Sequence, residues 1–414
     1  MESKNHLGAT VARQHDTTET SIVTERSVHG PHRSGLAKES RSMVRSALLA
    51  LPLAALMLTV PGCGDQTQTS SQSNTQQATT STPPASNDDE RAARSQNVLA
   101  ELVQEDQPGC TVAVGRNGDV VWTGVRGLAN LETGAPITPD TVMDIGSTSK
   151  QFTATAILLL ANQNKLNLTD PVSRYVPGLP AWADTVTVSQ LIHHQSGIPD
   201  YTGLLEDDGI DFKTPTTQEQ SVRRLSQVQS LTFPPGSKFE YSNSNYLLLA
   251  EVVAKTSGVP LPQFLSTEVF QPLGLAMVMD PVGKVPLKAV SYEPGPSGLT
   301  IADSLWEQVG DGAIQTTPSE LVRWADNYRT GSVGGEQLLT AQLADSVETD
   351  IPGARYAAGI KEWNDGSLDH YGTWAGFHSG LHISKDRHTS LAVVCNADET
   401  AQDELMKRLW QIWV

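Results

Sequence analysis

A serine and a lysine three residues apart are the first candidates for chemistry in this sequence. Ser147 and Lys150 lie in the segment DIGSTSKQF (144–152), between a strand-like run and a long apolar run. If a helix begins here, the two side chains lie one turn apart on the same face. A serine hydroxyl is a weak nucleophile until a base takes its proton, and a lysine kept neutral by burial can be that base. The spacing also fits a plain helix cap followed by a solvated lysine.

Two further stretches favour the catalytic interpretation. The segment FEYSNSNY holds the single Tyr-x-Asn of the chain, formed by Tyr241 and Asn243, and DHYGTWAGF holds His370-Tyr371-Gly372 on a predicted strand. The order Ser-x-x-Lys, Tyr-x-Asn, Lys/His-x-Gly resembles the serine β-lactamase and penicillin-binding protein superfamily. Within it, the sequence is most similar to the class C β-lactamase-related serine hydrolases, which include D-alanyl-D-alanine carboxypeptidases, D-aminopeptidases and esterases.

The resemblance covers roughly residues 95–414. The segment LIHHQSGIPDY resembles the family's Leu-Leu-x-His-Thr-Ser-Gly-Leu-Pro-Asp stretch, and FPPGSKFEYSNSNYLLLAEVVAKTSG matches the region of the second motif. GDGAIQTTPSELVRWA resembles the stretch that precedes the final strands. Several matches in the same order make a chance likeness improbable.

The third motif departs from the family's lysine form. The chain has no Lys-Thr-Gly, and His370 in the lysine's place is more similar to the peptidase and esterase branches than to true class C β-lactamases. A rival triplet, His-Ser-Gly, begins at His378; we prefer His370 because a Gly-Phe pair follows it at the family's interval. The nearby Trp374 fits either a substrate cleft or the core. No counterpart of the acidic deacylation base of class A enzymes can be placed.

The resemblance implies catalytic roles for three residues. Ser147 would attack a carbonyl and form an acyl-enzyme, while Lys150 and Tyr241 would share the proton transfers. The substrates implied are D-alanyl peptides, β-lactams or small esters, with no cofactor. The alternative is a penicillin-binding or cell-wall receptor protein that acylates with little turnover. The fold alone does not choose among these activities.

The resemblance also implies substrate-binding residues. Asn243 would orient the lysine and a substrate amide, and His370 would keep the site electropositive for a carboxylate or carbonyl. Gly372 and Thr373 belong to the strand beside the serine. The backbone N–H groups of Ser147 and Thr373 would form the oxyanion hole, where losing one donor typically costs about 100- to 1,000-fold in turnover.

These motifs require elements from both ends of the chain. Two strand-like runs flank Asn117-Gly118, a strong hairpin signal, and three more strand-like runs lie between 368 and 398. Helices are predicted over 91–106, over 246–258 with a glycine stop, after a Thr317 cap, and at the C-terminal end. The sequence therefore predicts an α+β fold of the β-lactamase/transpeptidase type: a central antiparallel sheet built from both chain ends and flanked by helices, with a mostly helical insertion at about 186–305.

The first 90 residues have the composition of an export segment and a tether. Residues 1–42 are polar and aperiodic, which suggests a disordered extension or a mis-assigned start. Residues 43–62 combine a basic start with a short apolar run, typical of a signal peptide. The run ends before Cys63, which resembles a lipoprotein cleavage site, although an ordinary signal with an incidental cysteine is the alternative. Residues 63–90 are rich in Gln, Ser and Thr and predict a disordered tether. We expect a lipid-anchored protein facing the periplasm or cell exterior, with the hydrolase domain at 91–414.

The charge balance excludes some partners. The 414-residue chain has 46 Asp and Glu against 29 Lys and Arg, and a formal net charge of −17. It has no basic stripe interleaved with aromatics, so we expect no nucleic-acid binding. Adjacent His193 and His194 cannot easily face one ion and have no cysteine or Glu-x-x-His partner nearby, so a structural loop role is favoured over a metal site. We expect a monomer that meets a small-molecule or peptidoglycan-type substrate.

Two cysteines remain if Cys63 carries a lipid. Cys110 begins the first predicted strand and Cys395 lies near the end of the last. In the resembled fold these strands are antiparallel neighbours, which brings a start beside an end. A disulfide in an oxidising compartment and two buried free thiols are the alternatives.

Overall fold

The structure is a computed structural model that describes residues 87–397 and 399–414. All the described residues lie within one compact unit, Thr80–Val414. The predicted extension, signal peptide and Cys63 lie outside the described residues, as does the tether up to residue 86. Over the two described ranges, none of the helices combines the length and the apolarity needed to cross a membrane.

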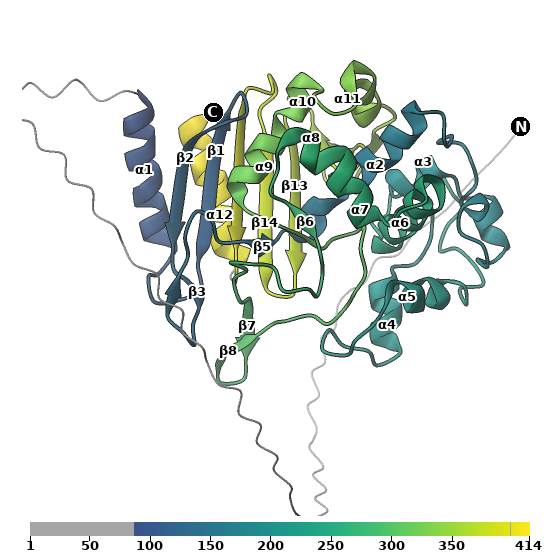
Figure 1. The fold of residues 1–414 in the computed structure, drawn as a ribbon, viewed down its shortest axis with the longest axis horizontal. Coiled ribbons are helices and arrows are strands. Elements are labelled where there is room, and N and C mark those ends of the chain that lie inside the picture. The colour runs from purple at the N-terminus through teal and green to yellow at the C-terminus, as the bar shows by residue number, and fades with distance from the viewer. Residues whose placement is uncertain (1–86, 398) are drawn as a thin grey trace, which may run out of the picture. The chain divides into compact units, whose positions relative to one another are not determined.

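An eight-stranded antiparallel sheet forms the centre of the described chain (Figure 1). Its spatial order is β10–β11–β12–β13–β14–β15–β1–β2, so strands from both chain ends lie side by side. This confirms the predicted α+β architecture. The strands are β1 (Cys110–Arg116), β2 (Asp119–Arg126), β10 (Val347–Glu348), β11 (Ala354–Tyr356), β12 (Lys361–Trp363), β13 (Leu368–Trp374), β14 (Phe377–Ile383) and β15 (Thr389–Cys395).

The predicted hairpin joins β1 to β2. Asn117 and Gly118 both have positive φ, 54° and 86°, as a two-residue turn compatible with strand twist requires. Successive residues of β1 point to opposite faces of the sheet. Val112 and Val114 therefore pack with Leu405 on one face, while Ala113 packs into the larger core on the other.

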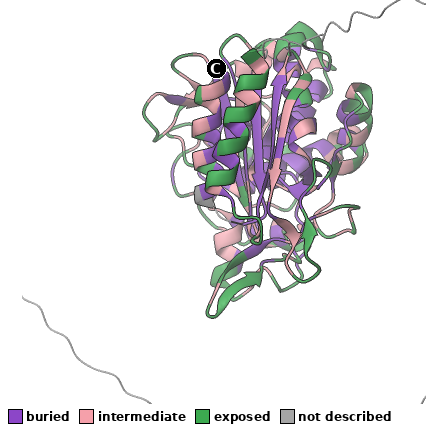
Figure 2. Ribbon diagram, turned by 90° about the vertical axis from the view of Figure 1, so that its left-hand side faces the viewer, coloured by how far each residue is buried: buried purple, intermediate pink, exposed green. Residues whose placement is uncertain are grey.

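Helices cover both faces of the sheet, which explains why β1 and β15 are buried along almost their whole length (Figure 2). On one face lie α1 (Asn87–Leu102) and α12 (Glu399–Trp413), which pack together. Helix α1 begins earlier than predicted, because Asp88, Asp89 and Glu90 suit the positive end of a helix dipole. On the other face, α9 (Pro318–Ala325) packs against β1 and β15.

Local signals set the helix ends as predicted. The Thr317 side chain accepts a hydrogen bond from the backbone N–H of Glu320, and Pro318 takes the first position of α9. Helix α6 (Asn243–Ser257) ends at Gly258, whose φ of 82° is left-handed.

The middle region is mostly helical but also contributes strands that the sequence did not predict. The β7–β8 hairpin projects from the end of the molecule drawn lowest in Figure 1. Strand β9 pairs with both β5 and β6. The remaining elements are α2 (Lys150–Asn162), α3 (Val188–Ile192), α4 (Tyr201–Asp207), α5 (Gln218–Leu225), α7 (Leu261–Leu265), α8 (Gln271–Leu273), α10 (Asn327–Thr330), α11 (Gly335–Leu343), β3 (Leu128–Asn130), β4 (Ala135–Pro136), β5 (Met143–Asp144), β6 (Val278–Met279), β7 (Tyr292–Gly295), β8 (Gly298–Ile301), β9 (Ile314–Thr316), the 3-10 turns η1 (Gly146–Ser149), η2 (Val172–Arg174) and η3 (Ala181–Asp184), and the π-helical turn η4 (Ser266–Phe270).

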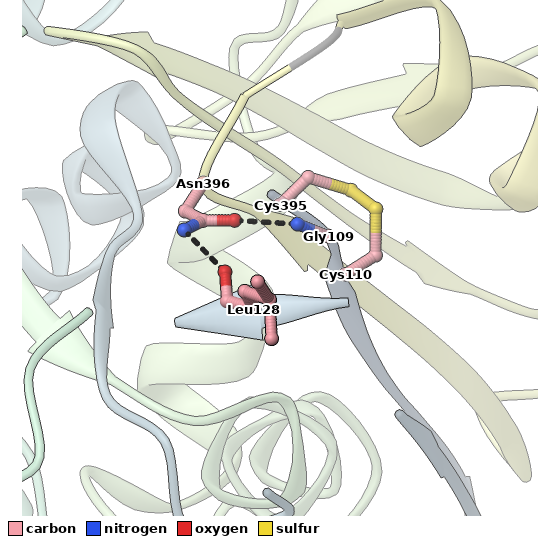
Figure 3. The surroundings of a disulfide bond; sticks show 5 residues. All are labelled: Gly109, Cys110, Leu128, Cys395 and Asn396. Carbon is pink, nitrogen blue, oxygen red and sulfur yellow. Dashed lines mark hydrogen bonds between the residues drawn. A yellow bond between two sulfur atoms is a disulfide. The ribbon is translucent and has the colours of Figure 1, made fainter. Parts of the chain in front are cut away.

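A disulfide joins Cys110 and Cys395 at the junction of the first and last strands (Figure 3). Their Cα atoms are 4.0 Å apart and pair directly in the sheet. Next to the bond, the Asn396 side chain accepts from the backbone N–H of Gly109 at 2.7 Å and donates to the carbonyl of Leu128 at 3.1 Å. Of the two alternatives, bonded or free thiols, the structure has the bond.

Candidate active site

Ser147 lies in the turn η1, immediately before the buried helix α2. The turn is set by Asp144, whose carboxylate accepts from the backbone N–H of Gly146 at 2.7 Å and from the Gln315 amide at 2.6 Å. Burial raises the pKa of Asp144, against the opposing effects of Lys288 and these hydrogen bonds. Hydrogen bonds to the buried Asp144 carboxylate thus fix the conformation of the turn that carries Ser147.

The Lys150 side chain is fully buried and is held by three acceptors. Its Nζ lies 2.9 Å from Ser147 Oγ, 2.8 Å from Asn243 Oδ1 and 2.7 Å from the carbonyl oxygen of Asp311. These match the three donors of an ammonium. A neutral amine could keep two of the bonds and accept the hydrogen of Ser147 in the third, which is the geometry a general base needs.

Asn243 is fixed at the first position of α6. Its backbone N–H donates to Asp200 Oδ2 at 2.7 Å, and Asp200 also caps α4 through Thr202. This leaves the Asn243 side chain free to hold Lys150. The predicted partnership of the second motif with the lysine is therefore present in the geometry.

Tyr241 stands at the open side of the site and is 39% exposed. Its ring stacks on His194, with ring centroids 4.2 Å apart, and the Lys150 Nζ lies 5.0 Å from the Tyr241 centroid. Within the described chain, no hydrogen bond joins its hydroxyl to Ser147 or Lys150. The ring of Tyr241 is thus placed beside Lys150, on the exposed side of the site from which a substrate enters.

His194 is a platform for Tyr241 that motif reasoning had treated only as a loop residue. Its Nδ1 accepts from the backbone N–H of Ser242 at 3.2 Å and pairs with the Asn245 amide at 3.0 Å. Burial, followed by the charge of Lys150, holds the pKa of His194 well below its usual value. His193 instead lies against the carbonyl of Ser189. Among the described residues, no cluster of His, Cys, Asp or Glu could hold a metal ion.

Two glycines let the serine turn and β13 meet at backbone distance. A Cβ on Gly372 would lie 2.1 Å from the carbonyl oxygen of Ile145 and 2.8 Å from the backbone nitrogen of Ser147. A Cβ on Gly146, whose φ is +48°, would lie 2.9 Å from the backbone nitrogen of Thr373. The amide nitrogens of Ser147 and Thr373 therefore meet at one junction, as an oxyanion hole requires.

The rival triplet, which begins at His378 on β14, contacts the residues of this junction. The Ser379 hydroxyl donates to the carbonyl of Ile145 at 2.7 Å and lies 2.9 Å from Thr148 Oγ1. His378 lies 3.2 Å from Thr373 Oγ1 through its Nδ1. Since His370, and not His378, lines the cleft with Ser147, the preferred triplet is the one placed at the site.

His370 is neutral, so the expectation that it keeps the site electropositive was wrong. Its Nδ1 lies 2.7 Å from the carbonyl of Tyr371 and must carry the hydrogen, so Nε2 accepts from the Tyr356 hydroxyl at 3.1 Å. Burial, then the charges of Lys150 and Lys361, lowers the pKa of His370 to about 3. A histidine this deeply buried cannot add positive charge at neutral pH.

A cleft of about 350 Å³ opens beside Ser147. Lys361 on β12 is the cation that the sequence did not assign, but its Nζ is paired with Asp369 at 3.0 Å. The acidic Asp350 also lines the cleft. The full lining is Ser147, Phe239, Tyr241, Thr349, Asp350, Ile351, Tyr356, Lys361, His370, Tyr371, Gly372 and Thr373.

Asp311 is a further residue at the site that no motif indicated. Its carbonyl oxygen holds Lys150, and its carboxylate accepts from the Tyr201 hydroxyl at 3.0 Å. Burial raises the pKa of Asp311, partly offset by Lys150. A second, smaller pocket of about 50 Å³ is lined by Ser147, Asn243 and Asp311, among others.

Comparisons with known proteins agree with this geometry. Residues 95–411 match the Beta-lactamase family, so the chain belongs to that family of serine hydrolases. Penicillin-binding protein 4* of Bacillus subtilis (strain 168) is 24% identical over 330 residues, which cover 75% of this chain and 72% of that protein.

Solved structures share the fold. The octameric penicillin-binding protein homologue from Pyrococcus abyssi has a TM-score of 0.68 and 24% identity, covering 78% of this chain and 76% of that one. The D-amino acid amidase from Ochrobactrum anthropi SV3 has a TM-score of 0.67 and 22% identity, covering 78% and 98%. At these identities the likeness establishes the fold alone.

Proposed function

We propose that this protein hydrolyses small acyl compounds through an acyl-enzyme on Ser147. The observation that carries the proposal is the buried Lys150 Nζ, 2.9 Å from Ser147 Oγ and fixed by Asn243 and Asp311. A nucleophile and a base held this close on packed backbone form the arrangement that nucleophilic catalysis needs.

The proposed acylation runs within this arrangement. Ser147 Oγ attacks the carbonyl carbon as its proton passes to a neutral Lys150 amine. The carbonyl oxygen gains the electron pair and is held by the N–H groups of Ser147 and Thr373. As that pair returns, the bond to the leaving group breaks, and the proton reaches the leaving group through Tyr241. Water then attacks the ester carbonyl and passes a proton to the Lys150 amine. As the bond to Ser147 Oγ breaks, that proton moves to Oγ and the acid is released.

The small pocket beside Ser147 supports turnover rather than a stalled acyl-enzyme. Its volume of about 50 Å³ exceeds the roughly 10–15 Å³ that one water needs. Asn243, Gln308 and Asp311 supply polar atoms around it. A hydrolytic water could thus stand next to the acylated serine.

Among D-alanyl peptides, β-lactams and esters, the electrostatics of the cleft favour neutral esters and amides. His370 is uncharged, and Lys361 is already paired with Asp369. A substrate carboxylate would therefore meet no unpaired cation among the residues that line the cleft, and it would lie near Asp350. Like charges at such a site are unfavourable.

Labelling and turnover assays test the proposal. The wild-type protein should react with a fluorophosphonate and hydrolyse p-nitrophenyl acetate, and Ser147→Ala should do neither. A chromogenic cephalosporin and a fluorescent penicillin report on the carboxylate-bearing alternatives. Steady cephalosporin turnover would contradict the preference for neutral substrates. A persistent penicillin band without turnover would support the receptor alternative, and labelling that survives in Ser147→Ala would refute the nucleophile.

We also propose that the protein is exported and anchored by a lipid on Cys63. The support is the sequence alone: a short apolar run that ends at Gly62-Cys63, followed by a polar tether. Cys63→Ser should move the protein from the membrane to the soluble extract. A mature N-terminus found away from residue 63 would contradict the anchor.

We further propose a monomer, which light scattering of the purified protein tests.

A further inference from the structure

A larger cavity shares the lining residue Thr373 with the cleft. Its volume is about 770 Å³. Its described lining comes from the end of α1 with the start of β1, from Phe212, from the β7–β8 hairpin, from the turn between β13 and β14, and from Ala397 and Ala401 near the start of α12. The apolar members of the wall are Leu102, Val103, Pro108, Phe212, Pro294, Leu299, Trp374, Ala375, Ala397 and Ala401.

Thr373 belongs to both spaces. The cleft is lined by the part of β13 from His370 to Thr373, and the cavity by the part from Thr373 to the following turn. The oxyanion N–H of Thr373 therefore sits at the boundary. A carbonyl held there would have room for one substituent in the cleft and for the other toward the cavity.

The position of the proton donor decides which substituent lies where. Tyr241 lines the cleft and not the cavity. A leaving group must be protonated as it departs, so it lies within reach of Tyr241, in the cleft. The acyl group, which stays on Ser147, then extends past Thr373 toward the cavity.

We propose that this cavity binds the acyl portion of the substrate, and that this portion is a large, uncharged, apolar group such as a medium-length alkyl chain. The inference rests on the proposed acyl-enzyme function. Among the lining residues that the structure describes, none is a lysine or an arginine, and the ionisable side chains are Glu293, His378 and Tyr292. An anionic acyl group would have no counter-charge there, whereas an alkyl chain would lose its contact with water.

The walls are held in place before any substrate arrives. The disulfide fixes Cys110, and the Asn396 amide donates to the carbonyls of Leu128 and of Val290, at the base of the hairpin (Figure 3). Trp374 is braced by Phe212 and Trp306, with centroids 4.9 and 5.8 Å away. A preformed cavity spares the cost of ordering side chains on binding.

The β8 strand offers apolar surface that is still exposed. Leu299 lines the cavity and is 41% exposed. An acyl chain in the cavity would cover this side chain, which adds to the buried apolar area. Each methylene that is fully buried should raise kcat/KM by about fourfold.

A chain-length series tests the proposal. Octanoate has six methylenes more than acetate, so if about half of them become fully buried, the wild-type kcat/KM for p-nitrophenyl octanoate should exceed that for the acetate on the order of 100-fold. Leu299→Arg, which places a cation in the cavity wall, should lower this ratio at least tenfold. Leu287→Arg, at a 68% exposed leucine outside the cavity, should leave the ratio unchanged. Equal rates for the two esters in the wild type, or equal ratios in the two variants, would overturn the proposal.

A binding measurement separates failure of the cavity from failure of the chemistry. The neutral fluorescent probe N-phenyl-1-naphthylamine can be titrated into Ser147→Ala, which requires no turnover. We expect saturable binding that Leu299→Arg weakens at least tenfold and Leu287→Arg does not. Absence of saturable binding would overturn the cavity proposal even if the esters are hydrolysed. Binding without ester hydrolysis would instead count against the proposed function alone.

Discussion

The cleft and the cavity share Thr373, but their lining residues differ in chemical character. The cleft is polar and tightly connected, because Lys150, Asn243 and Asp311 hold one another by hydrogen bonds. The cavity is roomier and mostly apolar, and its walls are fixed from outside by a disulfide and the Asn396 amide. In the cleft, the position of each polar group depends on hydrogen bonds to its neighbours. In the cavity, many apolar side chains each contribute a small part of the lining.

This difference predicts different consequences of mutation. Removing one group from the cleft should lower the rate of acylation, since the remaining buried partners lose their hydrogen bonds. Removing one contact from the cavity should cost selectivity or stability. A single cross-strand row links the two regions: Thr373 pairs with His378, His378 with Cys395, and Cys395 with Cys110.

Lys150→Ala should give the largest loss that leaves Ser147 in place. We expect acylation by p-nitrophenyl acetate to slow by about 10,000-fold, because the base is gone. Stopped-flow kinetics measures the rate, and circular dichroism checks the fold. Lys407→Ala, at a lysine exposed on α12, is the matched control and should react normally. A near-normal rate in Lys150→Ala would place the base elsewhere.

Tyr241→Phe should lower the rate of acylation by about 1,000-fold, because it removes the hydroxyl but keeps the ring. The stack on His194 and the contact with Lys150 Nζ use the ring and should survive. Comparing Tyr241→Phe with Tyr241→Leu separates the two contributions. If Phe reacts like the wild type and only Leu is slow, the ring rather than the hydroxyl matters.

Gly372→Ala should lower kcat by about 100-fold or more by spreading the oxyanion hole. The new Cβ would meet backbone atoms of Ile145 and Ser147, which cannot move aside as a flexible side chain can. Gly203→Ala is the control, because nothing lies within 4 Å of its Cβ. Retained activity in Gly372→Ala would show that the serine turn can retreat from β13 without loss.

The sequence predicted the parts of the site that side-chain types and spacing encode. Ser147, Lys150, Tyr241 and Asn243 were found because their motifs fix local geometry. The role of Asp311 could not be found, because it holds the lysine through a main-chain carbonyl that any residue carries. The neutral state of His370 also required three dimensions, since burial and two distant lysines cause it.

The same limit applies to the fold. The long strands β13, β14 and β15 and the Asn117-Gly118 hairpin were predicted from apolar runs and turn residues. Strands β5, β6 and β10 span only two residues each, too few to show alternation. They exist because distant segments pair with them, as β9 does with both β5 and β6. The cavity likewise depends on several segments far apart in sequence.

Replacing both cysteines by alanine should leave the cleft chemistry largely intact but lower stability. The bond spans a sequence separation of 285 residues, so the chain-entropy account gives a loss of about 5–6 kcal/mol in the free energy of unfolding. Urea denaturation of the double variant measures it, and ester kinetics at 25 °C checks the site. A stable variant with a much lower kcat would mean that the cross-strand row, rather than the local turn, positions Thr373.

The smallest predicted effect concerns pH and separates a neutral from a charged His370. Its native pKa of about 3 lies below the usual 6.5, so the unfolded chain binds a proton that the folded chain does not. The stability it contributes is therefore full above about pH 6.5 and falls as the pH drops toward 3. His193, His194 and His382 also have lowered pKa values, so the wild type should lose stability steeply in acid.

His370→Gln removes one such group. The unfolding free energy of this variant should therefore fall less steeply than that of the wild type, by up to about 1.4 kcal/mol per pH unit between pH 6 and 5. Denaturant midpoints from pH 5 to 8 measure both slopes. Parallel slopes below pH 6.5 would show that His370 is already protonated in the folded protein, which would restore a cation to the cleft and remove the argument against carboxylate-bearing substrates.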